Sequence, residues 1–133
     1  MGDLSYRIKL MQVDLNRRIP NLNSGGCVQF AYFFSKKLKS LNVPHRVYYL
    51  DYYQDELIGD TCEHVVVYIR NIGYIDGYKT KRHVDQFKLT RDDINKTRKS
   101  PYWNTLYNKN YNRLISQTIN EYFDGYKHTI RKK

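Results

Sequence analysis

The spacing of apolar residues changes at Asn42, and this change constrains the fold more than any other feature. Before it, apolar side chains recur every three or four residues over 4–18 and again over 27–41, which is the spacing of amphipathic helices. After it, the runs 46–50 and 64–69 are rich in the β-branched and aromatic residues that favour strands. The sequence therefore predicts an α+β fold in which helices pack on a small antiparallel sheet.

The remaining segments carry weaker local signals. Residues 51–63 are polar and acidic and predict a loop. The stretch 90–93, Thr-Arg-Asp-Asp, resembles a capping box and predicts a short helix behind it. An apolar stripe over 111–123 predicts a last helix, which Gly125 ends. We therefore expect residues 81–133 to form a basic, Tyr-rich and largely helical segment.

The 133 residues of the chain suit a single domain over 1–133, with a core at about residues 20–80. Charge is unevenly distributed along this domain. The net charge is +10, but residues 1–78 hold nine Lys and Arg against eight Asp and Glu, whereas residues 79–133 hold fourteen against five. Such a basic segment is typical of contact with nucleic acid or an acidic partner. An ordinary solvated surface explains the same imbalance, so both interpretations stay open.

The composition argues against membrane, disulfide-rich and zinc-binding classes. No stretch of about 18 apolar residues is present, so no transmembrane helix is expected. The first ten residues show no apolar run behind a basic start. Without such an export signal we expect a cytoplasmic protein of a bacterial or phage-infected cell. Two cysteines make no disulfide framework, and no Cys and His lie at zinc spacing, so the sequence predicts no metal and no cofactor.

A short turn before the second predicted helix places a cysteine where its thiol would be reactive. With Ser24 as N-cap, Cys27 occupies the first helical turn, where the helix end carries about half a positive charge. This field favours the thiolate, which is the nucleophilic form of cysteine. Gly25 and Gly26 would let a substrate approach the backbone closely. The plain alternative is a buried cysteine that acts as a small apolar residue.

A histidine and an aspartate stand at strand positions that can meet. His64 opens the second strand run, and a three-residue loop after that run would set Ile69 opposite Gly73. Asp76 would then share a face with His64, at a diagonal Cα separation of about 7–8 Å that the two side chains can span. With Cys27, these residues match the logic of a nucleophile, a base and a residue that orients the base.

Together these segments resemble the papain-like and transglutaminase-like cysteine superfamily, including its small bacterial and phage-encoded members. The matching segments, within residues 20–80, are NSGGCVQFA at 23–31, EHVVV at 63–67 and YIDG at 74–77. The resemblance implies a helix that carries Cys27, packed on an antiparallel sheet that carries His64 and then Asp76 as a catalytic triad.

The resemblance also implies an activity. The protein would be a cysteine-dependent hydrolase or acyltransferase that forms a Cys27 thioester. Its peptide or protein substrate would be attacked at a peptide bond, an isopeptide bond or a glutamine side chain. Papain-like members place a Gln a few residues before the cysteine as an oxyanion donor. This chain has none there, and the candidates to replace it are Asn21 and Asn23.

Other interpretations remain open at this point. The fold could be catalytically silent and serve as a structural or interaction protein, for example in a phage particle. Residues 79–133 would then contact nucleic acid or a neighbouring subunit, or the chain could bind nucleic acid by itself. Cys62, two residues before His64, would lie beside the site as a spare thiol, a redox partner of Cys27 or an incidental neighbour. The other histidines, which we expect to be structural or on the surface, are His45, His83 and His128.

Overall fold

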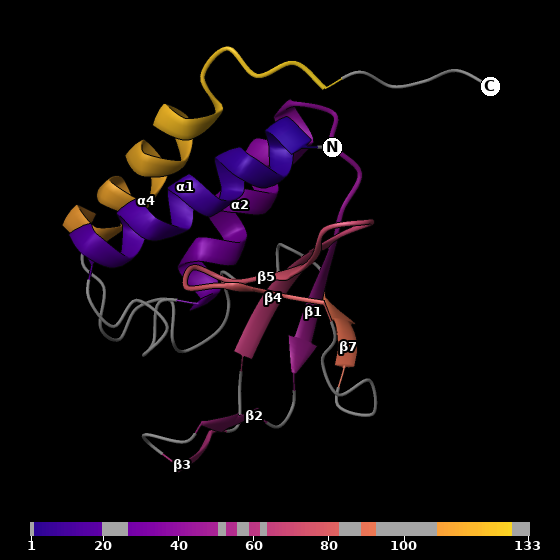
Figure 1. Ribbon diagram of the computed structural model, residues 1–133. Helices are drawn as coiled ribbons and strands as arrows, with labels where there is room; N and C mark the ends of the chain where they lie inside the picture. The colour runs from indigo at the N-terminus through magenta and orange to yellow at the C-terminus, as the bar shows by residue number, and fades with distance from the viewer. Residues whose placement is uncertain are drawn as a thin grey trace.

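Helices lie together on one side of an antiparallel sheet (Figure 1). The structure is a computed structural model, and it describes residues 2–19, 27–50, 53–55, 59–61, 64–82, 89–92 and 109–128. The helices within these residues are α1 (Gly2–Arg18), α2 (Cys27–Ser40) and α4 (Lys109–Phe123). α4 packs on both α1 and α2, and α2 packs on the sheet. The predicted α+β class is confirmed, and so are the helices expected near 4–18, 27–41 and 111–123.

The main sheet has the strand order β6-β5-β4-β1-β7, and each strand is antiparallel to its neighbours. A separate two-stranded ribbon joins β2 to β3. The strands of the sheet are β1 (Arg46–Leu50), β4 (His64–Ile69), β5 (Gly73–Ile75), β6 (Thr80–Lys81) and β7 (Leu89–Asp92), and those of the ribbon are β2 (Tyr53–Asp55) and β3 (Gly59–Thr61).

Two predictions of local structure are wrong. Residues 51–63 were expected to form a loop, but they contain the β2–β3 ribbon. Residues 90–93 were expected to start a helix, but Leu89–Asp92 forms β7 and pairs with β1. Without β7, one edge of β1 would present unpaired backbone N–H and C=O groups. This long-range pairing outweighs the local capping pattern, so the segment after residue 81 is not uniformly helical.

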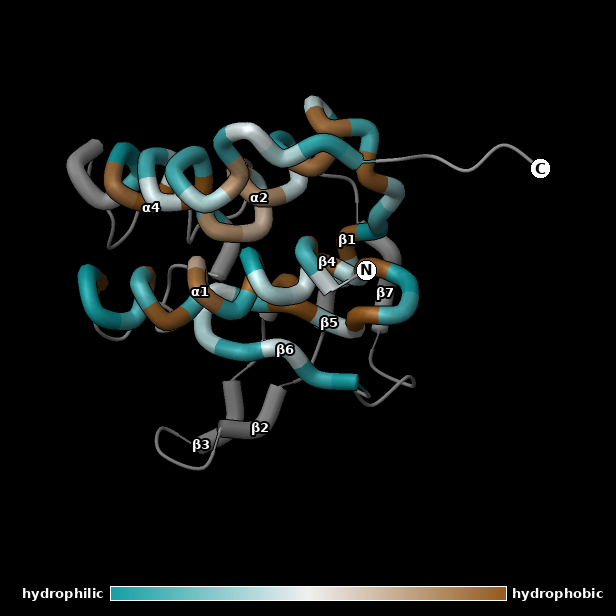
Figure 2. The backbone as a smooth tube through the Cα atoms, turned by 45° about the horizontal axis from the view of Figure 1, so that its top comes forward, coloured by the Kyte–Doolittle hydropathy of each residue, from teal (hydrophilic) through white to brown (hydrophobic). Residues whose placement is uncertain are grey.

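The core forms between the helices and one face of the sheet. Val65 and Val67 on β4 meet the apolar stripes of the helices, as does Val47 on β1. Figure 2 shows hydrophobic positions recurring along each helix between hydrophilic ones. Burying one large apolar side chain contributes roughly 1.5–3 kcal/mol. The largest fully buried side chains are Phe30, Phe34, Phe123, Leu4, Ile8, Met11, Leu15, Ile19, Leu38, Ile75 and Ile115.

The β4–β5 hairpin has the three-residue loop on which the expected placement of Asp76 depends. Ile69 pairs with Gly73, and the Ile72 N–H donates to the Ile69 carbonyl at 3.0 Å. Gly73 has a φ of +130°, and a Cβ atom at this position would lie 2.6 Å from the backbone oxygen of Lys81. Glycine is therefore required twice over, by the backbone conformation and by the close approach of β6.

We expect Gly73→Ala to lower the free energy of unfolding by about 2–3 kcal/mol, since it adds a steric clash to backbone strain. Gly125→Ala is the matched control, because Gly125 also has a positive φ (+75°) but has open space at its Cβ position. The control should cost only about 1 kcal/mol. Urea unfolding of both variants measures the difference, and equal costs would contradict the clash.

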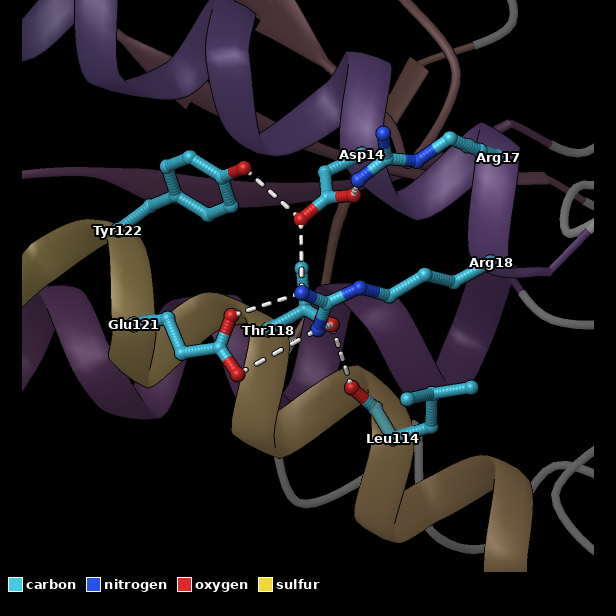
Figure 3. A network of polar contacts seen from close by, with 7 residues as sticks. All are labelled: Asp14, Arg17, Arg18, Leu114, Thr118, Glu121 and Tyr122. Atoms are coloured by element: carbon cyan, nitrogen blue, oxygen red, sulfur yellow. Dashed lines mark hydrogen bonds and ion pairs between the residues drawn. The ribbon is translucent and has the colours of Figure 1, made fainter.

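A buried carboxylate joins α1 to α4 (Figure 3). Asp14 on α1 is only 3% exposed. It accepts a hydrogen bond from the Tyr122 hydroxyl at 2.8 Å and pairs with Arg18 at 3.0 Å and with Arg17. Arg18 also reaches α4, where it pairs with Glu121 at 2.9 Å. This network satisfies a charge that would be costly to bury alone.

The surroundings of Asp14 favour its charged form. Burial by itself would raise the pKa of Asp14. The hydrogen bonds from Tyr122 and Arg17 and the positive charges of both arginines outweigh burial and hold the pKa below its ordinary value. The hydrogen bond to Asp14, helped by burial, raises the pKa of Tyr122. Since the folded pKa is the lower one, this stabilisation is present above pH 3.8 and is lost as the pH falls through the folded value.

Asp14→Asn should therefore be less stable than wild type by about 2–3 kcal/mol at pH 7. The difference should shrink as the pH is lowered below about 4, because the wild-type carboxyl then becomes protonated. Asp3→Asn is the matched control, since Asp3 pairs with Arg7 on the same helix but its side chain is 66% exposed. The control should change stability by less than about 0.5 kcal/mol. Urea unfolding against pH gives the result, and a pH-independent deficit would contradict the argument.

Candidate functional site

The three predicted catalytic residues stand at the ends of elements. Cys27 is the first residue of α2, His64 is the first residue of β4, and Asp76 directly follows β5. β4 and β5 are antiparallel, so the beginning of β4 and the end of β5 lie at the same end of the sheet. Continuing the register by one residue sets Asp76 opposite Val66, which is the arrangement expected from a three-residue loop.

Asp76 closes the turn between β5 and β6. It is 5% exposed, and its Oδ1 accepts hydrogen bonds from the backbone N–H groups of Tyr78 at 2.7 Å and Lys79 at 2.8 Å. Its own N–H donates to the Lys79 carbonyl at 3.1 Å. Two backbone donors on one carboxylate oxygen are typical of an Asx turn. The carboxylate is therefore held in one orientation by its own turn.

Helix α1 anchors this turn through two amide side chains. The Gln12 Nε2 donates to the Asp76 carbonyl at 2.9 Å and contacts the Thr80 hydroxyl at 3.2 Å. The Asn16 Nδ2 donates to the Gly77 carbonyl at 3.1 Å. Sequence reasoning missed both residues. The available signal was their spacing of four residues beside the apolar stripe of the first helix, which puts them on one side of it.

The other predicted site residues lie outside what the structure describes. For Cys27 and His64 only the backbone is described. The oxyanion candidates and the residues beside the thiol fall in undescribed segments, and these are Asn21, Asn23, Ser24, Gly25, Gly26 and Cys62. The structure therefore brings together the ends of β4 and β5 and the surroundings of Asp76, while the triad as a unit stays a prediction.

The two histidines whose side chains are described make structural contacts. The Nε2 of His45 lies 2.6 Å from the Ser35 hydroxyl, and its Nδ1 lies 2.8 Å from the Val43 carbonyl. Both nitrogens are thus used in holding the α2–β1 connection. The Nδ1 of His128 lies 3.1 Å from the Tyr126 hydroxyl. In the described segments no three His, Cys, Asp or Glu side chains gather as metal ligands, and no described helix is long and apolar enough to cross a membrane.

A groove of about 740 Å³ runs between α1 and the β5–β6 turn. Its wall includes Gln12, so it lies directly beside the anchored turn. Val13 and Tyr78 are 63% and 58% exposed at its lining, which makes part of the groove apolar. Lys9 and Lys79 add positive charge.

Comparison with known proteins identifies no relative. No family model matches the chain, and neither a curated protein nor a solved structure does. Any function must therefore be argued from the residues themselves.

The turn-closing contacts of Asp76 predict different effects for two substitutions. Asp76→Asn keeps an oxygen at Oδ1 that can accept from Tyr78 and Lys79, so its free energy of unfolding should fall by less than about 1 kcal/mol. Asp76→Ala removes the acceptor of two partly buried backbone donors and should cost about 1–3 kcal/mol. Urea unfolding, with amide hydrogen exchange at Tyr78 and Lys79, measures this. Equal losses in the two variants would show that the charge, and not the turn, is what stabilises this end of the sheet.

Proposed function

We propose that the protein is a cysteine-dependent hydrolase or acyltransferase that acts on an amide through a Cys27 thioester. The observation that carries this proposal is the antiparallel register, which sets the beginning of β4 and the end of β5 at one end of the sheet. His64 opens β4 and Asp76 follows β5, so the base and the residue that would orient it share that end.

The path of α2 supports a place for the nucleophile at the same end. α2 ends at Ser40, and a short turn leads into β1 at Arg46, which is the register partner of Tyr68 near the end of β4. Figure 1 shows α2 and β1 running in opposite directions. The 14 residues of α2 span about 21 Å, and the five of β1 about 17 Å. Because α2 runs antiparallel to β1 and is of similar length, its first residue, Cys27, is expected near the level of Leu50 and of its register partner His64.

The residues would act in the following way. The helix N-terminus and an imidazolium at His64 stabilise the Cys27 thiolate. The thiolate attacks the carbonyl carbon, and His64 gives its proton to the leaving amine as the C–N bond breaks. The thioester is then resolved by water or by a second amine, from which His64 takes a proton, and Cys27 is released. The Cys27 backbone N–H, with Asn21 or Asn23, would hold the oxyanion.

This mechanism places a geometric demand on His64. Because side chains alternate along a strand, position 64 belongs to the same face of β4 as Val66 and Tyr68. Val65 and Val67 belong to the other face, which packs on the helices. The imidazole must therefore reach around the end of the sheet, which the first position of a strand permits. Asp76 is suited to hold it there, because the turn and Gln12 already fix its position.

One observation favours a second candidate function, in which the chain has no catalytic activity. The turn-closing role of Asp76 accounts for its burial without any catalysis. The chain would then be a catalytically silent member of the same fold and act as a structural or interaction protein, for example in a phage. Its basic residues 79–133 would contact nucleic acid or an acidic partner.

The rate of Cys27 alkylation against pH separates the two candidates. If the thiolate–imidazolium pair exists, Cys27 reacts rapidly at pH 6 with an apparent pKa well below the ordinary value of about 8.5. His64→Ala should return that pKa toward the ordinary value. Asp76→Asn should slow alkylation at pH 6 severalfold although the turn is kept. Intact-mass measurement with peptide mapping follows Cys27, and Cys62 in the same samples is the internal control.

A Cys27 that titrates at about 8.5 in wild type, or that is indifferent to His64→Ala, would contradict catalysis. The silent interpretation predicts that outcome. A positive result justifies a screen with peptide and glutamine amides, in which hydrolysis and acyl transfer are distinguished by adding a primary amine.

A further inference from the structure

The face of the sheet that turns away from the helices carries a row of aromatic and cationic residues. Lys81 on β6 pairs with Tyr74 on β5, Tyr74 pairs with Tyr68 on β4, and Tyr68 pairs with Arg46 on β1. These four positions form one straight row across four strands. With neighbouring strands about 4.8 Å apart, the row is roughly 14 Å long.

The tyrosines of this face form one cluster. The ring centroids of Tyr68 and Tyr74 are 4.7 Å apart, and Tyr48 lies 6.3 Å from the first and 6.0 Å from the second. All three side chains are half-buried, so each ring is packed against its neighbours on one side and retains accessible surface. Burial and the two neighbouring tyrosines raise the pKa of Tyr74, so its hydroxyl stays neutral.

Two hollows flank Tyr68, and both are cationic. One, of about 370 Å³, is lined by Pro44, His45, Arg46, Tyr68 and Arg70. The other, of about 350 Å³, is lined by Tyr68, Asn71, Ile72, Gly73 and Arg82. Among the described residues that line these two hollows there is no carboxylate. Among the described side chains, no Asp or Glu pairs with Arg46, Arg70 or Arg82, and all three are exposed.

This combination selects one class of ligand. Arginines that pair with no described carboxylate attract an anion, and rings on a sheet surface between them offer faces on which flat groups can stack. Bases in a duplex are stacked on each other and hidden, whereas bases in a single strand can stack on aromatic side chains while the backbone phosphates meet cations. An acidic peptide would use the arginines but not the ring faces.

We propose that this face of the sheet binds single-stranded nucleic acid, with bases stacked at Tyr68 and Tyr74 and phosphates held by Arg46, Arg70 and Arg82. The site overlaps the basic segment 79–133 considered from the sequence only at Arg82, since Tyr68, Tyr74, Arg46 and Arg70 lie outside that segment. It lies across the sheet from α2, on the face to which positions 64 and 76 belong by register, but it uses none of Cys27, His64 and Asp76, so its test does not depend on the proposed catalysis.

The test uses the full chain and a fluorescein-labelled oligothymidylate, with binding measured by fluorescence anisotropy over a series of salt concentrations. Tyr68→Ala should weaken binding roughly five- to 100-fold through lost stacking, whereas Tyr68→Phe, which keeps the ring, should stay within about threefold of wild type. Arg70→Ala should reduce the slope of log affinity against log salt by about 0.7. Thermal unfolding of each variant confirms that it is folded.

Matched controls remove the same side chains from the helical side of the molecule. Tyr6 on α1 is 61% exposed, and Arg113 on α4 is exposed. Tyr6→Ala removes an aromatic ring and Arg113→Ala removes a positive charge, both away from the proposed site. Each should therefore change the affinity by less than about twofold. A labelled duplex of the same length should bind more weakly than the single strand.

Three results would overturn the proposal. One is equal weakening by Arg70→Ala and Arg113→Ala, which would show attraction by net charge alone. Another is binding unaffected by Tyr68→Ala and Arg70→Ala, which would move the contact to another part of the chain. The third is displacement of the oligonucleotide by polyglutamate as effectively, per charge, as by unlabelled oligonucleotide, which would indicate an acidic protein as the partner.

Discussion

The described structure depends on the polar contacts of the second half of α1. Asp14 is buried with its charge and satisfied by Tyr122, Arg17 and Arg18, and these contacts draw α4 onto α1. Gln12 and Asn16 are each two residues from Asp14, on the other side of α1, and they hold the backbone of the β5–β6 turn. Apolar burial supplies most of the stability but has no direction. The hydrogen bonds of α1 add the directional restraint that sets how the helices and the end of the sheet meet, and with it the position of Asp76.

The two faces of the sheet have different chemistry, and the two proposals use different parts of the sheet: the nucleic-acid site lies on one face, whereas the cysteine site lies at one end. The face with Val65, Val67 and Ile75 is covered by helices, and the proposed cysteine site belongs to the end of the sheet where α2 would begin. The opposite face carries Tyr48, Tyr68 and Tyr74 with arginines around them. A sheet presents alternate residues to opposite sides, so one set of strands can serve a core and a polar binding surface together. The two proposals share no residue, so each can be tested with its own substitutions.

Local patterns predicted much of the fold. The helical stripes around Ile8, Phe34 and Ile119, and the turn before Gly73, were all recognisable because their signals lie within a few residues. The failures were non-local. β7 looked like a helix start, and it is a strand because the edge of β1 needs a partner. The acidic stretch 51–63 looked like a loop, and its β2–β3 ribbon has no strong apolar alternation to reveal it. For the candidate site, the sequence predicted the order of Cys27, His64 and Asp76 but not that Gln12 and Asn16 hold the turn that Asp76 closes.

The sequence by itself determined the α+β class and the order of a helix-start cysteine, a strand-start histidine and a following aspartate, and it allowed the register that pairs Ile69 with Gly73. These features follow from periodicity and turn chemistry, which act between near neighbours. Only the tertiary structure decided that Asp76 closes a turn anchored by Gln12, that Asp14 is buried against Tyr122, and that Lys81, Tyr74, Tyr68 and Arg46 form one row. These depend on strand order and helix packing, which bring together residues that no local pattern relates.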